Sequence, residues 1–152
     1  MRISTRISTV VLLVGTGLSS PLSAQGQSEP EMGGTMERVG TMSQLMIHLI
    51  YPTSDAVFYI DTRTPTNDAE WSALEAQTLL LAESANLLLM PDRLRDEDQW
   101  ISDAKLLWEA GRAALRAAQD RDVEALSNLN DQLYMSCVTC HEHYRPGYPA
   151  RY

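Results

Sequence analysis

The chain has 152 residues, of which 44% are apolar, with 8 glycines and 7 prolines. This composition suits one compact domain rather than two domains or a disordered tail. The 12 basic and 20 acidic residues give a net charge of −8. Nucleic acid is therefore an unfavourable partner, and we expect the surface to favour basic patches on partner proteins.

Residues 1–24 have the pattern of a secretory signal peptide. Arg2 and Arg6 precede an apolar stretch that includes residues 10–14, and residues 22–24 (Leu-Ser-Ala) resemble a cleavage site. The apolar stretch is too short to span a bilayer, and the next residue, Gln25, is not the cysteine that lipid attachment requires. The sequence predicts a soluble periplasmic protein without stable membrane insertion. Loss of the two arginines would change its net charge from −8 to −10.

Residues 25–34 are polar and contain proline and glycine, which predicts a flexible lead before a single domain at 35–152. A first helix is expected over residues 36–51. Pro52 predicts a break or kink, followed by a fresh turn over residues 56–60. The apolar residues of the first helix recur at three- and four-residue steps: Val39, Met42, Leu45, Met46, Leu49 and Ile50.

A second helix is expected over residues 68–90, because Asn67 and Glu70 form a capping-box pattern and Pro91 ends the run. Its inward face is predicted to carry Trp71, Leu74, Thr78, Leu81, Ala85 and Leu88.

Two more helices complete the pattern. The third follows the acidic group at residues 96–98 and ends near residues 118–120, with Trp100 and Trp108 on its inward side. The fourth runs from residue 122 until Pro146 and Gly147 end it. Since no segment alternates with period two, we predict an all-α protein, an antiparallel four-helix bundle.

The fourth helix contains the motif Cys137-x-x-Cys140-His141. In such a motif two thiols add to the vinyl groups of haem and the adjacent imidazole coordinates iron. On a helix the two cysteines, His141 and Tyr144 share one face, so one flat macrocycle can meet all four. The sequence predicts one covalently attached haem c on the C-terminal helix, with iron bound by His141. A disulfide, a redox-active thiol pair and half of a zinc site are the alternatives.

The first helix offers three candidates for the other face of the iron. Met42 and Met46 lie on its apolar stripe, where methionine also serves as flexible core packing. His48 lies off the stripe, which favours a solvated histidine. His143 is about 200° around the helix from His141, which predicts a surface position.

Arginine can neutralise haem propionates by bidentate pairing. Among Arg38, Arg93, Arg112 and Arg145 we select Arg38. The three tryptophans suit core positions. With histidine only at residues 48, 141 and 143, and no glycine-flanked serine or phosphate-binding loop, we expect no enzymatic turnover.

A helical chain with its haem motif on the last helix, followed by Tyr144 and Arg145, resembles the class II cytochromes c, which include cytochromes c-prime and their low-spin relatives. The resemblance covers about residues 35–144 and implies that a first-helix residue faces the distal side of iron. Two alignments with the family give different distal residues. Counting back from the second helix selects Met46. The family also has an arginine that precedes the distal residue, and if Arg38 is this arginine the distal residue is Met42. We favour Met46. The resemblance also implies pairing into a homodimer through the first two helices.

Two functions follow from these expectations. In the first, His141 and a methionine hold a six-coordinate haem for periplasmic electron transport with redox partner proteins. In the second, His141 alone holds the iron and the open side binds or senses small gases. Membership of a larger assembly is a third, weaker expectation.

Overall fold

The computed structural model describes residues 37–145 and 147. The chain divides into the units Met1–Thr35 and Met36–Tyr152, and all the described residues belong to the second. The predicted signal peptide and the lead at 25–34 therefore lie outside the described residues. Within the described part every regular element is a helix, which confirms the all-α class. None of its helices is long and apolar enough to cross a membrane.

The first helical segment consists of α1 (Met42–Leu45), the π-helical η1 (Met46–Ile50) and α2 (Tyr51–Phe58), which follow one another without a gap. It begins at Met42, whereas the sequence pattern predicted a start near residue 36. The capping box at Thr41 is the cause. The Thr41 hydroxyl accepts from the Gln44 amide at 3.2 Å, and the Gln44 side chain accepts from the Thr41 amide at 3.0 Å.

Of the break or kink predicted at Pro52, the break is wrong, because the chain stays helical through this residue. Pro52 lies in the first turn of α2, directly after the π-helical turn η1. Neighbouring hydroxyl groups supply donors to the carbonyls of the preceding turn. Thr53 donates to the Leu49 carbonyl at 2.7 Å, and Ser54 donates to the Ile50 carbonyl at 2.8 Å. These bonds add donors at the Leu49 and Ile50 carbonyls, close to the proline.

Helix α3 (Asp68–Leu88) begins where the capping pattern placed it. The Asn67 side chain accepts from the Glu70 amide at 3.1 Å, while the Glu70 carboxylate accepts from the Thr66 amide, one residue beyond the expected partner. The helix ends two residues before the predicted end. There Arg93 donates to the Leu87 carbonyl at 3.1 Å. All six residues predicted to face inward are buried.

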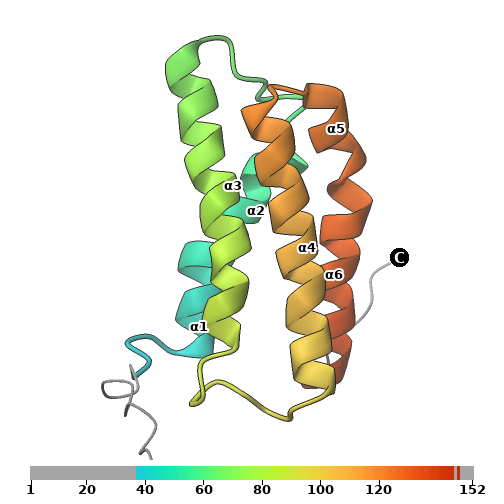
Figure 1. The fold of residues 1–152 in the computed structure, drawn as a ribbon. Helices are drawn as coiled ribbons and strands as arrows, with labels where there is room; N and C mark the ends of the chain where they lie inside the picture. The colour runs from blue at the N-terminus through green and yellow to red at the C-terminus, as the bar shows by residue number, and fades with distance from the viewer. Residues whose placement is uncertain (1–36, 146, 148–152) are drawn as a thin grey trace, which may run out of the picture. The chain divides into compact units, whose positions relative to one another are not determined.

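Helix α4 (Gln99–Gln119) runs beside α3 in the opposite direction (Figure 1). The two helices approach closely at Gly111. A Cβ atom at this position would lie 2.7 Å from the Ala82 Cα atom, so only glycine permits this spacing. Small residues at the contact let the two backbones pack directly against each other.

The predicted fourth helix is divided into α5 (Val123–Asn128) and α6 (Asn130–Tyr144), with Leu129 between them. The Asp122 carboxylate accepts from the Ala125 amide at 2.9 Å and caps α5. Helix α6 packs against α4 and also touches α2 (Figure 1). It ends at Tyr144, three residues after His141.

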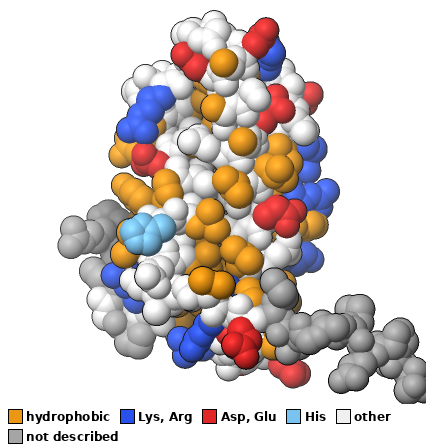
Figure 2. Space-filling model, turned by 90° about the vertical axis from the view of Figure 1, so that its left-hand side faces the viewer, with side chains coloured by type: hydrophobic (Ala, Val, Ile, Leu, Met, Phe, Trp, Pro, Cys, Tyr) orange, Lys and Arg blue, Asp and Glu red, His pale blue; other side chains and the backbone are white. Residues whose placement is uncertain are grey.

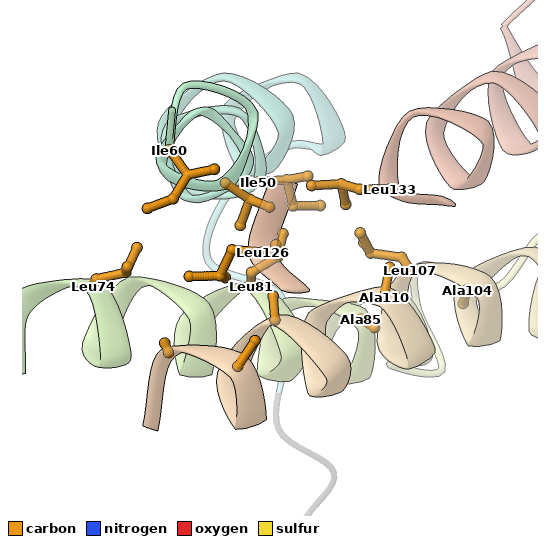
Figure 3. Close-up of a cluster of buried hydrophobic side chains, with 14 of the residues drawn as sticks. Ile50, Ile60, Leu74, Leu81, Ala85, Ala104, Leu107, Ala110, Leu126 and Leu133 are labelled. Carbon is orange, nitrogen blue, oxygen red and sulfur yellow. The ribbon is translucent and has the colours of Figure 1, made fainter. Parts of the chain in front are cut away.

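The core is a cluster of aliphatic side chains between these helices (Figure 3). Trp71 and Trp100 are buried and Trp108 is half-buried, in agreement with the predicted core positions. The cluster draws on the first helical segment and on every later helix. Its labelled members in Figure 3 are Ile50, Ile60, Leu74, Leu81, Ala85, Ala104, Leu107, Ala110, Leu126 and Leu133.

Candidate functional site

Helix α6 presents Cys137, Cys140 and His141 as half-buried side chains, and both thiols are free. Burial raises the pKa of Cys137. It also raises the pKa of Cys140 to about 11, with smaller contributions from the charges of Asp103 and Cys137. Reactive thiol pairs depend on a lowered pKa, because the thiolate is the nucleophile. The surroundings of these two cysteines therefore oppose a thiol-exchange site.

A cavity of about 420 Å³ opens beside the two cysteines. Its size lies in the range of small-molecule sites, about 300–1,000 Å³. The first helical segment and α6 form its walls, and Leu88 of α3 and Leu107 of α4 also line it. The remaining lining residues are Met46, Ile47, Ile50, Tyr51, Ser54, Phe58, Asp103, Tyr134, Ser136, Cys137, Cys140, His141 and Arg145.

A second cavity, of about 270 Å³, adjoins the same motif. It shares five lining residues with the first: Met46, Ile47, Cys140, His141 and Arg145. Its other lining residues are Met42, Ser43, Arg95, Trp100 and Tyr144. His141 and Cys140 thus belong to the wall that the two cavities have in common.

The His141 imidazole is suited to bind a metal ion. Burial lowers its pKa, and the positive charge of Arg145 lowers it further. Both effects favour the neutral ring, which is the form that donates a lone pair to a metal.

The three candidates for the distal iron ligand, all in the first helical segment, differ in which cavity they line. Met46 lines both cavities together with His141, whereas Met42 lines only the second. The His48 side chain is exposed and lines neither cavity, as expected for a solvated histidine.

Figure 2 shows the face of the molecule that carries α1 and α3, with exposed apolar side chains along its centre.

The π-helical turn η1 affects which residues reach the first cavity. From Met46 to Phe58, every fourth residue lines it: Met46, Ile50, Ser54 and Phe58. In a regular α-helix a twelve-residue span turns about 120° beyond three full turns, which would carry Met46 and Phe58 to different faces. The wider π turn reduces this drift, since each of its residues turns through a smaller angle. The irregular turn therefore keeps this row of side chains on the cavity.

Tyr144 lines the second cavity and joins α6 to the start of α4. Its hydroxyl donates a hydrogen bond to the Asp96 carboxylate, and its ring meets Trp100 edge-on, with 4.7 Å between ring centroids. The hydrogen bond from Tyr144 lowers the pKa of Asp96, and the bond from the Trp100 amide lowers it further. The Trp100 indole in turn donates to the Leu88 carbonyl at 2.8 Å.

Most of the predicted arginines contact groups outside the cavities. Arg38 pairs with Asp92, with its amide 3.0 Å from the carboxylate, and does not line either cavity. Arg93 donates to the carbonyls of Leu87 and Gly40, and Arg112 lies over the ring of Trp108.

Two arginines do line the site. Arg145, one of the predicted candidates, lines both cavities, and Arg95 lines the second. Arg95 was not predicted, because it lies in the connection between α3 and α4 and no sequence pattern relates that connection to α6.

Asp103 is a buried carboxylate that the sequence analysis also missed. It is 1% exposed and lines the first cavity. One of its oxygens accepts from the Gln99 amide group at 2.9 Å, and the other lies 2.7 Å from Nδ1 of His143. His143 is exposed, contacts α4 through Asp103 and lines neither cavity. In the sequence, Asp103 could have been recognised as a charged residue on the apolar helix face that holds Trp100, Ala104 and Leu107.

Comparisons of the chain with protein-family models, with curated proteins and with solved structures find no match. The roles of the residues around the two cavities therefore rest on their chemistry and placement. A flat apolar macrocycle with a metal centre fits these residues. They provide a largely apolar cavity, two protonated thiols one helical turn apart, and a neutral imidazole on the wall that the two cavities share.

Proposed function

We propose that the protein is an exported mono-haem c-type cytochrome that acts in periplasmic electron transfer. The observation that carries this proposal is the placement of the Cys-x-x-Cys-His motif, whose Cys140 and His141 lie on the wall common to two adjoining cavities. We further propose that the helices form an antiparallel four-helix bundle with the motif on its C-terminal helix. The helices α3 and α4, which run in opposite directions, and the position of α6 against α4 support this class.

The residues around the cavities would bind a haem in different ways. Cys137 and Cys140 would attach it, His141 would ligate its iron, and Met46 is the proposed sixth ligand, with Met42 as the alternative. When bound, the haem supplies one-electron redox chemistry. A thioether ligand and burial both raise the reduction potential of a haem.

The chain itself would exclude water from this centre. Ile50, Phe58, Leu88 and Leu107 contribute apolar surface to the first cavity. Trp100 closes part of the second. A low-dielectric surrounding of this kind disfavours the extra charge of ferric haem and so favours the ferrous form.

The second candidate is a gas-binding or sensing haem protein in which His141 alone holds the iron. The observation behind it is that Met46 is only one of the first-segment residues, with Ile47, that line both cavities beside His141, so the distal side of a bound haem can also be apolar. The flexible thioether of Met46 could line such a pocket without ligating iron. The two candidates differ in whether the sixth position is filled.

A spectroscopic experiment on the full-length protein tests both candidates. The protein is expressed together with a c-type haem maturation system, and covalent haem is measured on the denatured protein. We expect one haem per chain, and none in a Cys137→Ser, Cys140→Ser variant. A wild-type protein without covalent haem would contradict both candidates.

Carbon monoxide then separates electron transfer from gas binding. We expect the reduced protein to remain low-spin and to bind the gas slowly. Met46→Leu should bind it rapidly, and the matched variant Met42→Leu should behave like wild type. Immediate binding by the wild-type protein would reject the electron-transfer proposal in favour of the gas-binding one.

A further inference from the structure

We infer that the carboxylate groups of the bound haem lie in the second cavity, where Arg95 is their principal cationic partner. This inference rests on the proposed function, because it concerns the orientation of the haem that the motif would attach. It assigns a role to a residue in the connection between α3 and α4.

The two cavities share Arg145 but differ in their second charged residue. In the first cavity this residue is the buried carboxylate of Asp103, and the rest of the lining is mostly apolar. A second carboxylate placed there would be repelled across a low-dielectric space. The second cavity is lined by Arg95 in addition to Arg145, and its described lining includes no acidic residue. An amphipathic ligand is therefore oriented with its apolar edge in the first cavity and its anionic edge in the second.

The position of Arg95 is determined by its neighbour in the chain. The Asp96 carboxylate accepts hydrogen bonds from the Tyr144 hydroxyl and, at 2.9 Å, from the Trp100 amide. These bonds hold the connection against the end of α6, so that Arg95 reaches the cavity that Tyr144 and His141 also line. Asp96 has its oxygens occupied by these donors, which leaves the guanidinium group of Arg95 suited to an external anion.

Arg38, the arginine that the sequence analysis selected, is held elsewhere. Arg38 interacts with Asp92, with 3.5 Å between its Nε atom and the carboxylate, and its backbone amide binds the same group. To reach a carboxylate in the second cavity it would have to give up these contacts. Arg95 already lines the second cavity.

The test compares four variants of the haem-loaded protein: Arg95→Gln, Arg38→Gln, Arg112→Gln and Asp103→Asn. Two properties are measured: the midpoint potential, and the carboxylate bands in redox-induced infrared difference spectra with isotope-labelled haem propionates. Covalent haem content is confirmed first for each variant. Loss of a cation beside the haem disfavours the electron-rich ferrous state. We therefore expect Arg95→Gln to lower the potential and to shift the propionate bands.

The other variants make the inference specific. Arg112→Gln, on the outer side of α4, should match wild type in both measurements. Asp103→Asn should raise the potential, because it removes a negative charge, and should leave the propionate bands in place. Unchanged bands in Arg95→Gln, or a shift in Arg38→Gln instead, would overturn the inference while leaving covalent haem intact. Absence of haem from the wild-type protein would overturn it together with the proposed function.

Discussion

Tyr144 links the end of α6 to the start of α4 through two different interactions. Its ring packs edge-on against Trp100, and its hydroxyl donates to Asp96. The hydrogen bond lowers the pKa of Asp96 below its ordinary value of 3.8. A carboxylate whose pKa is lowered in the folded state stabilises the fold above its unfolded pKa, and the stabilisation disappears as the pH falls through the folded value.

We expect Tyr144→Phe to be less stable than wild type at neutral pH, since it loses the hydrogen bond and keeps the ring contact. The difference should shrink below pH 3.8, where Asp96 becomes protonated in the unfolded chain and then in the folded protein. Urea unfolding at neutral and at acid pH measures the difference in the free energy of unfolding between the variant and the wild type. Tyr59→Phe, at an exposed tyrosine, is the matched control. An equal difference at both pH values would contradict this account.

The chemistry of single residues could be predicted from the sequence only where a local motif or a helical repeat carries it. The Cys-x-x-Cys-His spacing selected Cys137, Cys140 and His141 as candidates, and the apolar repeat together with the family resemblance selected Met46. All four residues line the first cavity. Asp103 and Arg95 could not be found in this way, because each reaches the site through packing between elements that are distant in the chain.

At the scale of elements, the contact between α3 and α4 depends on the absence of one side chain. A Cβ atom at Gly111 would lie 2.7 Å from backbone atoms of Ala82. Backbone cannot move aside as the end of a flexible side chain can, so relief of this overlap requires the helices to separate.

Gly111→Ala should therefore lower the free energy of unfolding by about 1–3 kcal/mol, the usual cost of overpacking. The overlap has to outweigh the roughly 1 kcal/mol that alanine gains over glycine inside a helix. Gly40→Ala is the matched control, because its new Cβ atom would meet nothing closer than 3.6 Å. Thermal or urea unfolding measures both variants. A Gly111→Ala protein as stable as wild type would show that the two helices can adjust without cost.

Helix boundaries were predictable where a side chain caps the backbone and less predictable elsewhere. Asn67 and Asp122 cap α3 and α5 at the expected places. The start at Met42, the continuous helix through Pro52 and the division at Leu129 were not predicted. Pro52 directly follows the π-helical turn η1, an irregularity that helix propensity does not include.

At the scale of the whole molecule, the net charge of −8 acts over a longer distance than any single contact. Its field is screened over about 10 Å at an ionic strength of 0.1 M. We expect electron exchange between the haem-loaded protein and a basic redox protein to slow as salt is added.

Stopped-flow measurements over a range of ionic strengths test this expectation. An uncharged small-molecule oxidant should react at a rate that changes little with salt and serves as the control. A rate with the basic partner that stays constant or increases with salt would show that the overall charge does not guide the encounter.

The helical class of the whole molecule followed from the absence of period-two patterns and from four apolar repeats. The arrangement that creates the two cavities did not follow, because it depends on where the first helical segment crosses α6. That crossing is set by side-chain packing among residues such as Ile50, Leu107 and Leu133, which belong to three different parts of the chain.

The π-helical turn η1 has a consequence for how this protein could change over generations. A wide turn of this kind is equivalent to one extra residue within an α-helix. Because the turn absorbs this residue, deletion of a single residue between Met46 and Ile50 would restore a regular helix and leave the turns on either side close to their present orientation. The length of the chain could therefore change at this turn while Met46 stayed on the side of the helix that lines the cavities.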